Sequence, residues 1–502
     1  MSAPPANRAS AAQRPALCGA RERVSAATLA ERVERLATAL QETQPRPRMV
    51  GLLADNGPDW IVVDLAAERI GLPLVPLPGF FTPAQLRHAL EATGMDALFC
   101  ATPVSALSLG FQGGGRLEGV DLPWFRRAAE RVTIPAGTSK ITFTSGTTGT
   151  PKGVCLSAAQ QRTVSVALVQ ATHRLGIERH LSLLPLPVLL ENIAGVYAPM
   201  LAGATCIVPP LAEVGVAGAA SFDAHACLAA IERWQATSVI LLPQMLLALT
   251  AALESGAPRP STLRFAAVGG AKVASALIER ARAAGLPAYE GYGLSECASV
   301  VALNVPRADR PGSVGRALSH VDVRIGDDGE ILVAGSGFLG YLGAEVAEDG
   351  ASATEWLPTG DLGRLDADGF LYVDGRRKHQ LITSFGRNVA PEWPEAELTA
   401  SPVIAQAAVF GEARPQLSAV IVPRSSAVGD GAIDASVQAA NRQLPDYAQI
   451  AHWVRAFAPF TAADGLATPN GRIRRDAIWA RYAKRLEYLY ETRTGAGADA
   501  LL

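Results

Sequence analysis

Hydroxyl-bearing residues and glycines alternate in one stretch of the chain, 142–154, which also carries a lysine near its end. These residues are Thr144, Ser145, Gly146, Thr147, Thr148, Gly149, Thr150 and Gly153. Glycines bring backbone N–H groups close to an anion, hydroxyls add donors, and Lys152 adds a mobile positive charge. The stretch predicts a loop that binds nucleotide phosphates. It is not the common P-loop, because Gly follows Lys152 where that motif requires Ser or Thr. The alternative is a polar turn without a ligand.

A second stretch, 291–298, places an aromatic ring, a glycine, a hydroxyl and a carboxylate close together in Tyr292, Gly293, Ser295 and Glu296. An aromatic ring can stack on a purine, and a carboxylate can hold Mg²⁺ against phosphate oxygens. In isolation this stretch would be a turn at the end of a strand. Beside a phosphate-binding loop, it favours a nucleotide site.

Both stretches resemble signatures of the adenylate-forming superfamily, which contains acyl-CoA synthetases, peptide-synthetase adenylation domains and luciferases. The first is similar to the family's phosphate-binding loop. The second is similar to its Tyr-Gly-x-Thr-Glu motif, with Ser295 keeping the hydroxyl of the usual threonine. The resemblance covers roughly residues 28–478, and the motifs occur in the family's order.

The resemblance implies roles for further residues of the nucleotide site. Gly269, Gly270 and Ala271 would border the adenine and the acyl carboxylate. Asp361 would bind the ribose hydroxyls, which suits a carboxylate because it accepts from two vicinal donors. Arg376 would contact the ribose and a phosphate. Without the resemblance, this segment would be an acidic hairpin followed by solvated basic residues.

The resemblance also implies a hinge and a tunnel for a thiol. Lys378 would lie at the hinge between a large and a small domain, where His379 replaces the usual Asp or Asn. Gly386 would line the tunnel for the pantetheine thiol. The form of the segment Gly-Arg-Asn-Val-Ala-Pro, 386–391, is most similar to the long-chain fatty acyl-CoA synthetases.

Two positions depart from the family pattern. Val188 stands where the motif Leu-Pro-Leu-x-His-x-x-Glu has histidine, so a polar group near the acyl pocket is lost. Arg472 stands where the lysine of the adenylation step is expected. A guanidinium stays cationic and can bridge an α-phosphate and a carboxylate, although its shape differs from an ammonium. The alternative is a solvated arginine in a basic run with Arg474 and Arg475.

The elements that must position these residues alternate between strand and helix. We expect strands near 49–55, 72–77, 97–101, 181–186, 204–209 and 238–243, and capping boxes at Thr28–Glu31 and Thr82–Gln85. We expect a Gly-rich loop over 110–119, and hairpin turns at 327–329 and 366–369. Later strands are expected near 405–410 and 417–422, and a helix from Asp476.

This pattern predicts an α/β fold of helix-covered sheets, followed by a β-rich stretch and a smaller mixed segment. The resemblance implies that these form a large N-terminal domain with a β-rich subdomain and a small mobile α+β C-terminal domain. The expected divisions are a disordered tail over 1–22, the AMP-binding domain over 23–374, a hinge over 375–378 and the small domain over 379–502.

Composition excludes several classes of partner. The chain has 502 residues, 49% of them hydrophobic, and a net charge of −2 without a long basic or acidic block. Nucleic acid is therefore not expected as a partner. The six cysteines are scattered and form no Cys-x-x-Cys pair, which favours a reduced, cytoplasmic setting. Two uncharged runs, 192–212 and 236–253, contain prolines, and we interpret them as buried elements rather than membrane spans.

The resemblance implies an ATP-dependent ligase that forms an acyl-adenylate from a fatty or aryl acid and transfers the acyl group to coenzyme A. Lys152 and the loop would hold the phosphates, Glu296 would hold Mg²⁺, and Arg472 would orient the acid. An acyl carrier protein is an alternative acceptor, and a degenerate binding module with little turnover is a rival. We expect the acyl pocket to be drawn from 192–200, 268–271 and 297–301.

Overall fold

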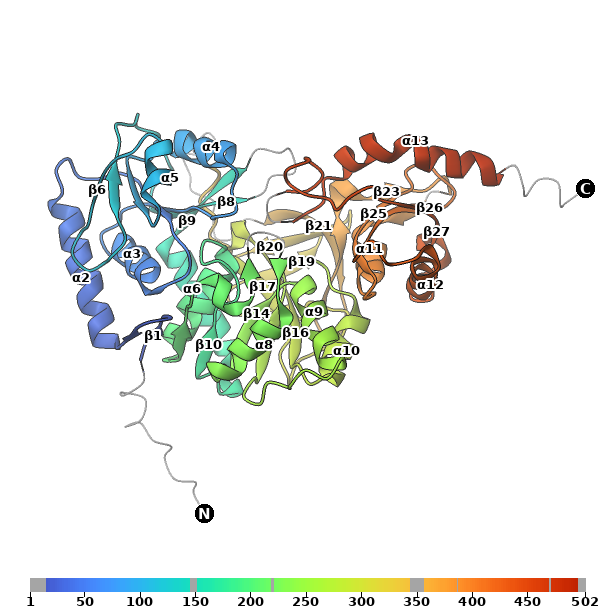
Figure 1. The fold of residues 1–502 in the computed structure, drawn as a ribbon, viewed down its shortest axis with the longest axis horizontal. Helices are drawn as coiled ribbons and strands as arrows, with labels where there is room; N and C mark the ends of the chain where they lie inside the picture. Colours follow the sequence, from blue (N-terminus) through green and yellow to red (C-terminus); the bar gives the residue numbers. More distant parts are fainter. Residues whose placement is uncertain are drawn as a thin grey trace, which may run out of the picture.

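The computed structural model describes residues 15–144, 151–217, 221–343, 356–385, 387–468 and 471–494. Figure 1 shows a mixed α/β molecule with a large N-terminal domain and a smaller C-terminal domain, as predicted. Helix α2 lies at one end of the molecule and the helices of the C-terminal domain lie at the other. Within the described residues, every helix is too short or too polar to span a bilayer.

A seven-stranded sheet forms the first part of the N-terminal domain. Its order is β6 (Gln112–Gly115), β7 (Trp124–Arg126), β5 (Ala97–Cys100), β3 (Val50–Leu53), β4 (Leu74–Pro76), β8 (Thr138–Thr144), β9 (Lys152–Ser157). Strands β3, β4, β5 and β8 run parallel, and the hairpin β8–β9 closes one edge. The helices of this region are α2 (Ala26–Glu42), α3 (Pro58–Arg69), α4 (Pro83–Thr93) and α5 (Pro103–Ser108).

The helix starts test two sequence predictions. The capping box at α4 is present, with Thr82 and Gln85 in reciprocal hydrogen bonds, and Gly94 ends the helix in a left-handed conformation. Helix α2 begins earlier than predicted, because Ser25 is the N-cap and accepts a hydrogen bond from the Thr28 backbone N–H at 3.0 Å. The capping box predicted at Thr28 is therefore wrong.

A nine-stranded sheet forms the second part. Its order is β18 (Arg316–Ala317), β17 (Ser299–Leu303), β16 (Ala288–Leu294), β15 (Phe265–Val268), β14 (Ser238–Leu241), β10 (Arg179–Leu181), β11 (Thr205–Ile207), β1 (Leu17–Cys18), β2 (Arg23–Val24). The strands from β1 to β16 in this order run parallel. The helices are α6 (Ala158–Thr172), α7 (Ala198–Leu201), α8 (Ala224–Arg233), α9 (Pro243–Glu254) and α10 (Ser275–Ala283), with the π-helix η2 (Glu191–Tyr197).

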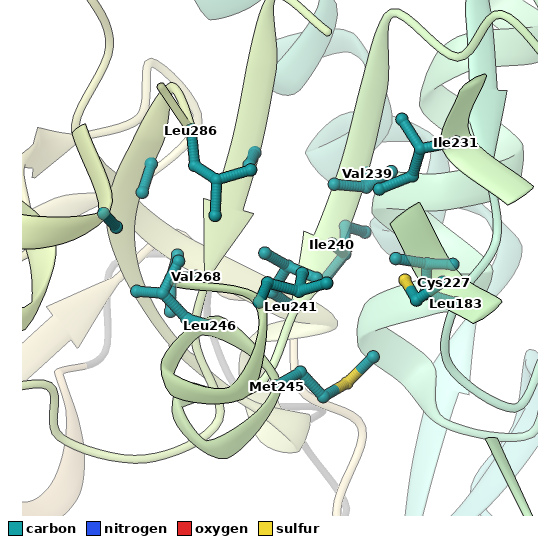
Figure 2. Close-up of a cluster of buried hydrophobic side chains, with 14 of the residues drawn as sticks. Leu183, Cys227, Ile231, Val239, Ile240, Leu241, Met245, Leu246, Val268 and Leu286 are labelled. Atoms are coloured by element: carbon teal, nitrogen blue, oxygen red, sulfur yellow. The ribbon is translucent and has the colours of Figure 1, made fainter. Parts of the chain in front are cut away.

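The core of this second part lies between the central parallel strands and helices α8, α9 and α10. Figure 2 shows Val239, Ile240 and Leu241 of β14 among Ile231 of α8 and Leu246 of α9. The continuous apolar runs of these strands are explained by burial on both faces of the sheet.

Several segments differ from the predictions. The expected tail, 1–22, contains β1, whose Leu17 and Cys18 are buried beside β11, so the tail prediction is wrong for this part. The expected loop 110–119 contains β6, because its backbone pairs with β7 despite the glycines. The strand expected over 181–186 ends at Leu181.

Four further N-terminal strands form an antiparallel sheet, and both predicted hairpins connect its strands. They are β19 (Asp322–Ile325), β20 (Glu330–Ala334), β21 (Leu357–Leu365) and β22 (Leu371–Arg376). A small pair joins β12 (Val216–Ala217) and β13 (Ser221–Phe222). The 3₁₀ turns are η1 (His173–Leu175), η3 (Leu211–Val214), η4 (Ser295–Cys297), η5 (Arg377–His379) and η6 (Asp446–Ala448).

The C-terminal domain is built on a three-stranded sheet with its own buried cluster of apolar side chains. Its elements are β23 (Leu381–Ile382), β24 (Asn388–Val389), α11 (Glu392–Thr399), β25 (Ile404–Phe410), β26 (Leu417–Pro423), α12 (Asp430–Asn441), β27 (Ile450–Arg455) and α13 (Arg475–Thr494). The predicted strands near 405 and 417 and the final helix are present.

Candidate active site

The candidate site lies where the parallel strands β15 and β16 end, which is where α/β sheets commonly bind ligands. Strand β15 leads into Gly269–Ala271, and β16 contains Tyr292 and Gly293. The hairpin β8–β9, the hairpin β21–β22 and one residue of the C-terminal domain, Arg472, contribute the other groups described below.

The strands that flank the phosphate loop are well defined. Thr144 ends β8 and pairs with Lys152, which begins β9, and the Thr144 hydroxyl lies 3.4 Å from the Lys152 carbonyl oxygen. The loop between them, 145–150, lies outside the described residues. It contains Ser145, Gly146, Thr147, Thr148, Gly149 and Thr150, whose roles stay predictions.

Lys152 and Glu296 are linked through an aromatic residue that the sequence reasoning missed, Tyr341. The Lys152 Nζ lies 5.3 Å from the centroid of the Tyr341 ring, and the Tyr341 hydroxyl donates to Glu296 Oε1 at 2.7 Å. Burial, and then Glu296, raises the pKa of Tyr341, so this hydroxyl stays protonated and donates. The residue is held in place because its neighbour Leu342 donates its backbone N–H to Gly153 O at 2.8 Å.

Glu296 fits the predicted magnesium site by the chemistry of its donor. A carboxylate can bind an ion while it accepts the bond from Tyr341, because its two oxygens offer several lone pairs. No cluster of three or more His, Cys, Asp or Glu side chains suited to a metal occurs within the described ranges. Glu296 would hold the ion, and Mg²⁺ commonly keeps water and substrate phosphate oxygens in the rest of its shell.

Tyr292, Asp361 and Arg376 form one connected group. The Tyr292 hydroxyl donates to Asp361 Oδ2 at 2.5 Å, and Arg376 Nε lies 2.9 Å from Asp361 Oδ1. Strand pairing places Asp361 of β21 opposite Arg376 of β22. Burial raises the pKa of Asp361, while Arg376 and then Tyr292 oppose that rise. A buried carboxylate oriented by two donors can accept hydrogen bonds from vicinal hydroxyls.

The backbone after Tyr292 requires glycine at position 293. A Cβ there would lie 1.6 Å from the Ser299 carbonyl oxygen, because β16 and β17 pair closely at a bulge. The returning chain passes through positive φ at Ala298 (48°) and Ser299 (102°). Such strained residues cluster at functional sites. The tight return encloses η4, whose first residue is the half-buried Ser295 and which presents Glu296 to Tyr341.

Arg472 of the C-terminal domain reaches the loop after β15. Its Nη2 lies 3.4 Å from the Gly270 carbonyl oxygen, and Gly270 itself has φ 85°. The Arg472 side chain is accessible to water. Partial desolvation by the surrounding protein lowers its pKa and Arg376 lowers it further, whereas Asp361 and Glu296 raise it. Arg472 therefore shares one electrostatic environment with the carboxylates of the site.

The structure brings the predicted hinge residue close to the same cations. Burial lowers the pKa of Lys378 in η5, and Arg376 and Lys152 lower it further. The neighbouring His379 pairs with Glu392 of α11 through Nδ1 at 2.5 Å. Gly386 lies outside the described residues, so its place in a thiol tunnel stays a prediction.

The π-helix η2 anchors two buried polar clusters that sequence reasoning missed. In the first, Glu191 Oε1 lies 3.0 Å from His180 Nε2, so a histidine from β10 partners this glutamate although Val188 replaces the family histidine. In the second, Lys140 Nζ lies 2.9 Å from Asp64 Oδ1 and contacts the amide of Asn192. A lysine in the middle of a β-strand gave no signal for this pairing.

The expected acyl pocket is corrected in part by these contacts. Asn192 donates to Asp64 Oδ2 at 2.9 Å and is buried in the ion cluster. Cys297 and Val301 pack in a buried cluster with Ile331 and its neighbours. These three positions therefore support the fold instead of lining a pocket.

Comparison with known proteins identifies the family of the chain. Residues 6–342 match the model of the AMP-binding enzyme family, and residues 378–494 match that of the AMP-binding enzyme C-terminal domain. A long-chain-fatty-acid–CoA ligase, FadD15 of Mycobacterium bovis, is 30% identical, with 86% of each chain covered. A feruloyl-CoA synthase of Amycolatopsis is 31% identical, with 81% of this chain and 84% of that protein covered.

Among solved structures, the amide bond synthetase McbA of Marinactinospora thermotolerans superposes with a TM-score of 0.73. The two chains are 28% identical, and the match covers 93% of this chain and 97% of McbA. The family match spans most of the N-terminal domain and extends separately into the C-terminal domain, so the predicted membership of the adenylate-forming enzymes is confirmed. The chain belongs to the AMP-binding enzyme family.

Proposed function

We propose that this enzyme joins a carboxylic acid to coenzyme A in two steps, with ATP as the energy source. In the first step a carboxylate oxygen attacks the α-phosphorus of ATP, the bond to the β-phosphate oxygen breaks, and pyrophosphate leaves. In the second step the thiol sulfur attacks the acyl carbon of the mixed anhydride. The thiol loses its proton, and AMP leaves with the electron pair of the broken C–O bond.

The nucleotide would be held by groups that already face one another. Asp361, oriented by Tyr292 and Arg376, would accept hydrogen bonds from the ribose hydroxyls. Lys152 and the loop 144–150 would bind the phosphates. Magnesium, when bound at Glu296, would neutralise charge on the phosphate oxygens.

Arg472 would act in the first step as the cation that bridges the acid and the α-phosphate. Its guanidinium lies at Gly270 O, beside the loop assigned to the acyl carboxylate, and within electrostatic range of Asp361 and Glu296. Positioning two anions and stabilising developing negative charge needs no side-chain nucleophile. This contact between Arg472 and the loop after β15 is the observation that carries the proposal.

The second step would follow a rotation of the C-terminal domain about 375–378. Such a rotation would withdraw Arg472 and let one pocket serve both half-reactions. Coenzyme A as acceptor is supported by the two relatives named as CoA ligase or CoA synthase. An amine is the second acceptor to test, because the similar solved structure is named an amide bond synthetase.

The acid would be fatty or aryl. One relative of similar identity is named for a long-chain fatty acid and the other for a ferulic acid thioester, so both classes belong in the test.

Product analysis tests the proposal. The enzyme is incubated with Mg-ATP, a panel of fatty and aryl acids, and either coenzyme A, an amine, a carrier protein or no acceptor. We expect an acyl-CoA thioester, AMP and pyrophosphate in equal amounts with at least one acid, identified by mass spectrometry. An acyl-adenylate that stays bound without turnover would support the rival binding module. An amide product would show that an amine is the acceptor, and a carrier-bound acyl group would show that a carrier protein is.

A further inference from the structure

Helix α11 of the C-terminal domain meets the N-terminal domain through a cation at each of its ends. At its first turn, Lys272 Nζ lies 6.0 Å from the centroid of the Trp393 ring. At its last turn, Arg280 of α10 donates from Nη1 to the carbonyl oxygen of Ala400 at 2.9 Å. Ala400 also packs against the buried cluster of the nine-stranded sheet. The helix is therefore docked along the N-terminal domain.

The Arg280 side chain is built to make this contact. Its Nε donates to Glu254 Oε1 at 3.1 Å and its Nη2 to Glu254 Oε2 at 2.8 Å, a bidentate pair that fixes the plane of the guanidinium. The remaining nitrogen, Nη1, then faces Ala400 O. The end of a helix carries carbonyls without partners in the helix and a partial negative charge, so a cation is favourable there.

The contact can open without stranding a charge. When α11 moves away, Arg280 loses one hydrogen bond to a neutral carbonyl but keeps its pair with Glu254, and both side chains are already partly exposed. The bond between Arg472 and Gly270 O is likewise directed to a carbonyl across the same boundary. Bonds of this type favour one arrangement of two domains while allowing them to separate.

We propose that Arg280 is a positioning residue for the first half-reaction. It holds α11 in the arrangement in which Arg472 reaches the loop after β15, and it releases the helix for the second half-reaction. The proposal rests on the proposed function and on the predicted hinge at 375–378. Helix α10 would thus help to set the arrangement of the two domains, without itself contacting the nucleotide or the acid.

A matched pair of variants on α10 tests the proposal. Arg280→Met keeps an unbranched apolar stem and removes the donors. Arg282→Met removes the neighbouring arginine, which pairs with Asp309 within the N-terminal domain at 2.7 Å. We expect Arg280→Met to slow acid-dependent pyrophosphate release about five- to tenfold, the range of one partly exposed charged hydrogen bond. Transfer from preformed acyl-adenylate to coenzyme A should stay within about twofold. Arg282→Met should not separate the two steps.

A distance measurement tests, without catalysis, whether the contact between Arg280 and Ala400 holds the two domains in this arrangement. The described native cysteines are all buried, so cysteines introduced at the exposed Ala30 of α2 and Gln438 of α12 can carry spin labels selectively. We expect Arg280→Met, but not Arg282→Met, to add or enlarge a second population of distances. Unchanged distances, or equal slowing of both half-reactions, would overturn the proposal. A wild type without acid-dependent pyrophosphate release would contradict the proposed function. The distances would still show whether Arg280 holds the two domains in this arrangement.

Discussion

Tyr341 donates its hydroxyl proton to Glu296 at 2.7 Å while the face of its ring lies against the Lys152 ammonium. One side chain from the segment that pairs with β9 thus orients both the predicted magnesium ligand and the predicted phosphate cation. This arrangement gives the first prediction.

Tyr341→Phe keeps the ring over Lys152 and removes the hydrogen bond to Glu296. We expect the KM for Mg-ATP in pyrophosphate release to rise about five- to tenfold, because one hydrogen bond to a charged group is lost. Tyr372→Phe is the control, because the Tyr372 hydroxyl bonds Asp366 near the turn of the β21–β22 hairpin and makes no contact with Lys152 or Glu296 among those described above. Equal effects of the two variants would contradict a special role for Tyr341.

Gly293→Ala should destabilise the enzyme by about 3 kcal/mol or more, because a Cβ would collide with the backbone of β17. The measurement is the midpoint of thermal unfolding. Gly79→Ala is the control, because no atom lies within 4 Å of its added Cβ. A Gly293→Ala variant that unfolds with the wild type would show that β16 and β17 pair less closely than described.

Lys140→Met should cost about 3–5 kcal/mol, because it leaves the buried Asp64 carboxylate without its cation. The double variant Lys140→Met with Asp64→Leu should recover part of that loss, since replacing both charges removes the stranded one. Both are compared by thermal unfolding. If the double variant is less stable than the sum of the single losses, the ion pair is not the source of the effect.

Stability should fall with rising pH because of Glu290. Burial raises the pKa of this carboxyl from 4.5 to about 8, with Lys272 opposing the rise. The folded state therefore holds its proton more tightly than the unfolded state, so the stabilisation is complete below pH 4.5 and is lost as pH rises through 8.

Glu290→Gln should flatten this part of the dependence of stability on pH. Its unfolding midpoint should therefore rise relative to that of the wild type as the pH increases from 5 to 8. Glu279→Gln, at an exposed position of α10, is the control and should follow the wild type. A constant difference between Glu290→Gln and the wild type across this range would contradict the buried, protonated state.

The sequence predicted those parts of the fold and the site that depend on local patterns. Apolar runs, the cap at Thr82 and the turns at Gly329 and Gly369 mark elements that form where expected. The resemblance to a family predicted that Asp361 and Arg376 both contact the nucleotide. Their contact with each other follows from strand register, which places Asp361 of β21 opposite Arg376 of β22 in one hairpin.

The missed features depend on contacts between distant segments. Tyr341, the pair His180–Glu191 and the ion cluster around Lys140 each join residues from separate elements, and no spacing rule links them. Strand β1 was missed because two residues are too short for a periodic signal, although burial beside β11 holds them in the sheet.

The most direct test of the central claim is ATP–pyrophosphate exchange in the wild type, Arg472→Lys and Arg472→Met, with an acid selected from the panel. We expect acid-dependent exchange in the wild type. The lysine variant should exchange more slowly, because an ammonium retains the charge but lacks the paired N–H donors of a guanidinium. The methionine variant should lose about 100-fold or more of the rate. Normal binding of the nucleotide in all three, measured by calorimetry, would place the loss in the chemical step. Exchange in Arg472→Met at the wild-type rate would contradict the account, because it would show that adenylation proceeds without the cation that reaches Gly270.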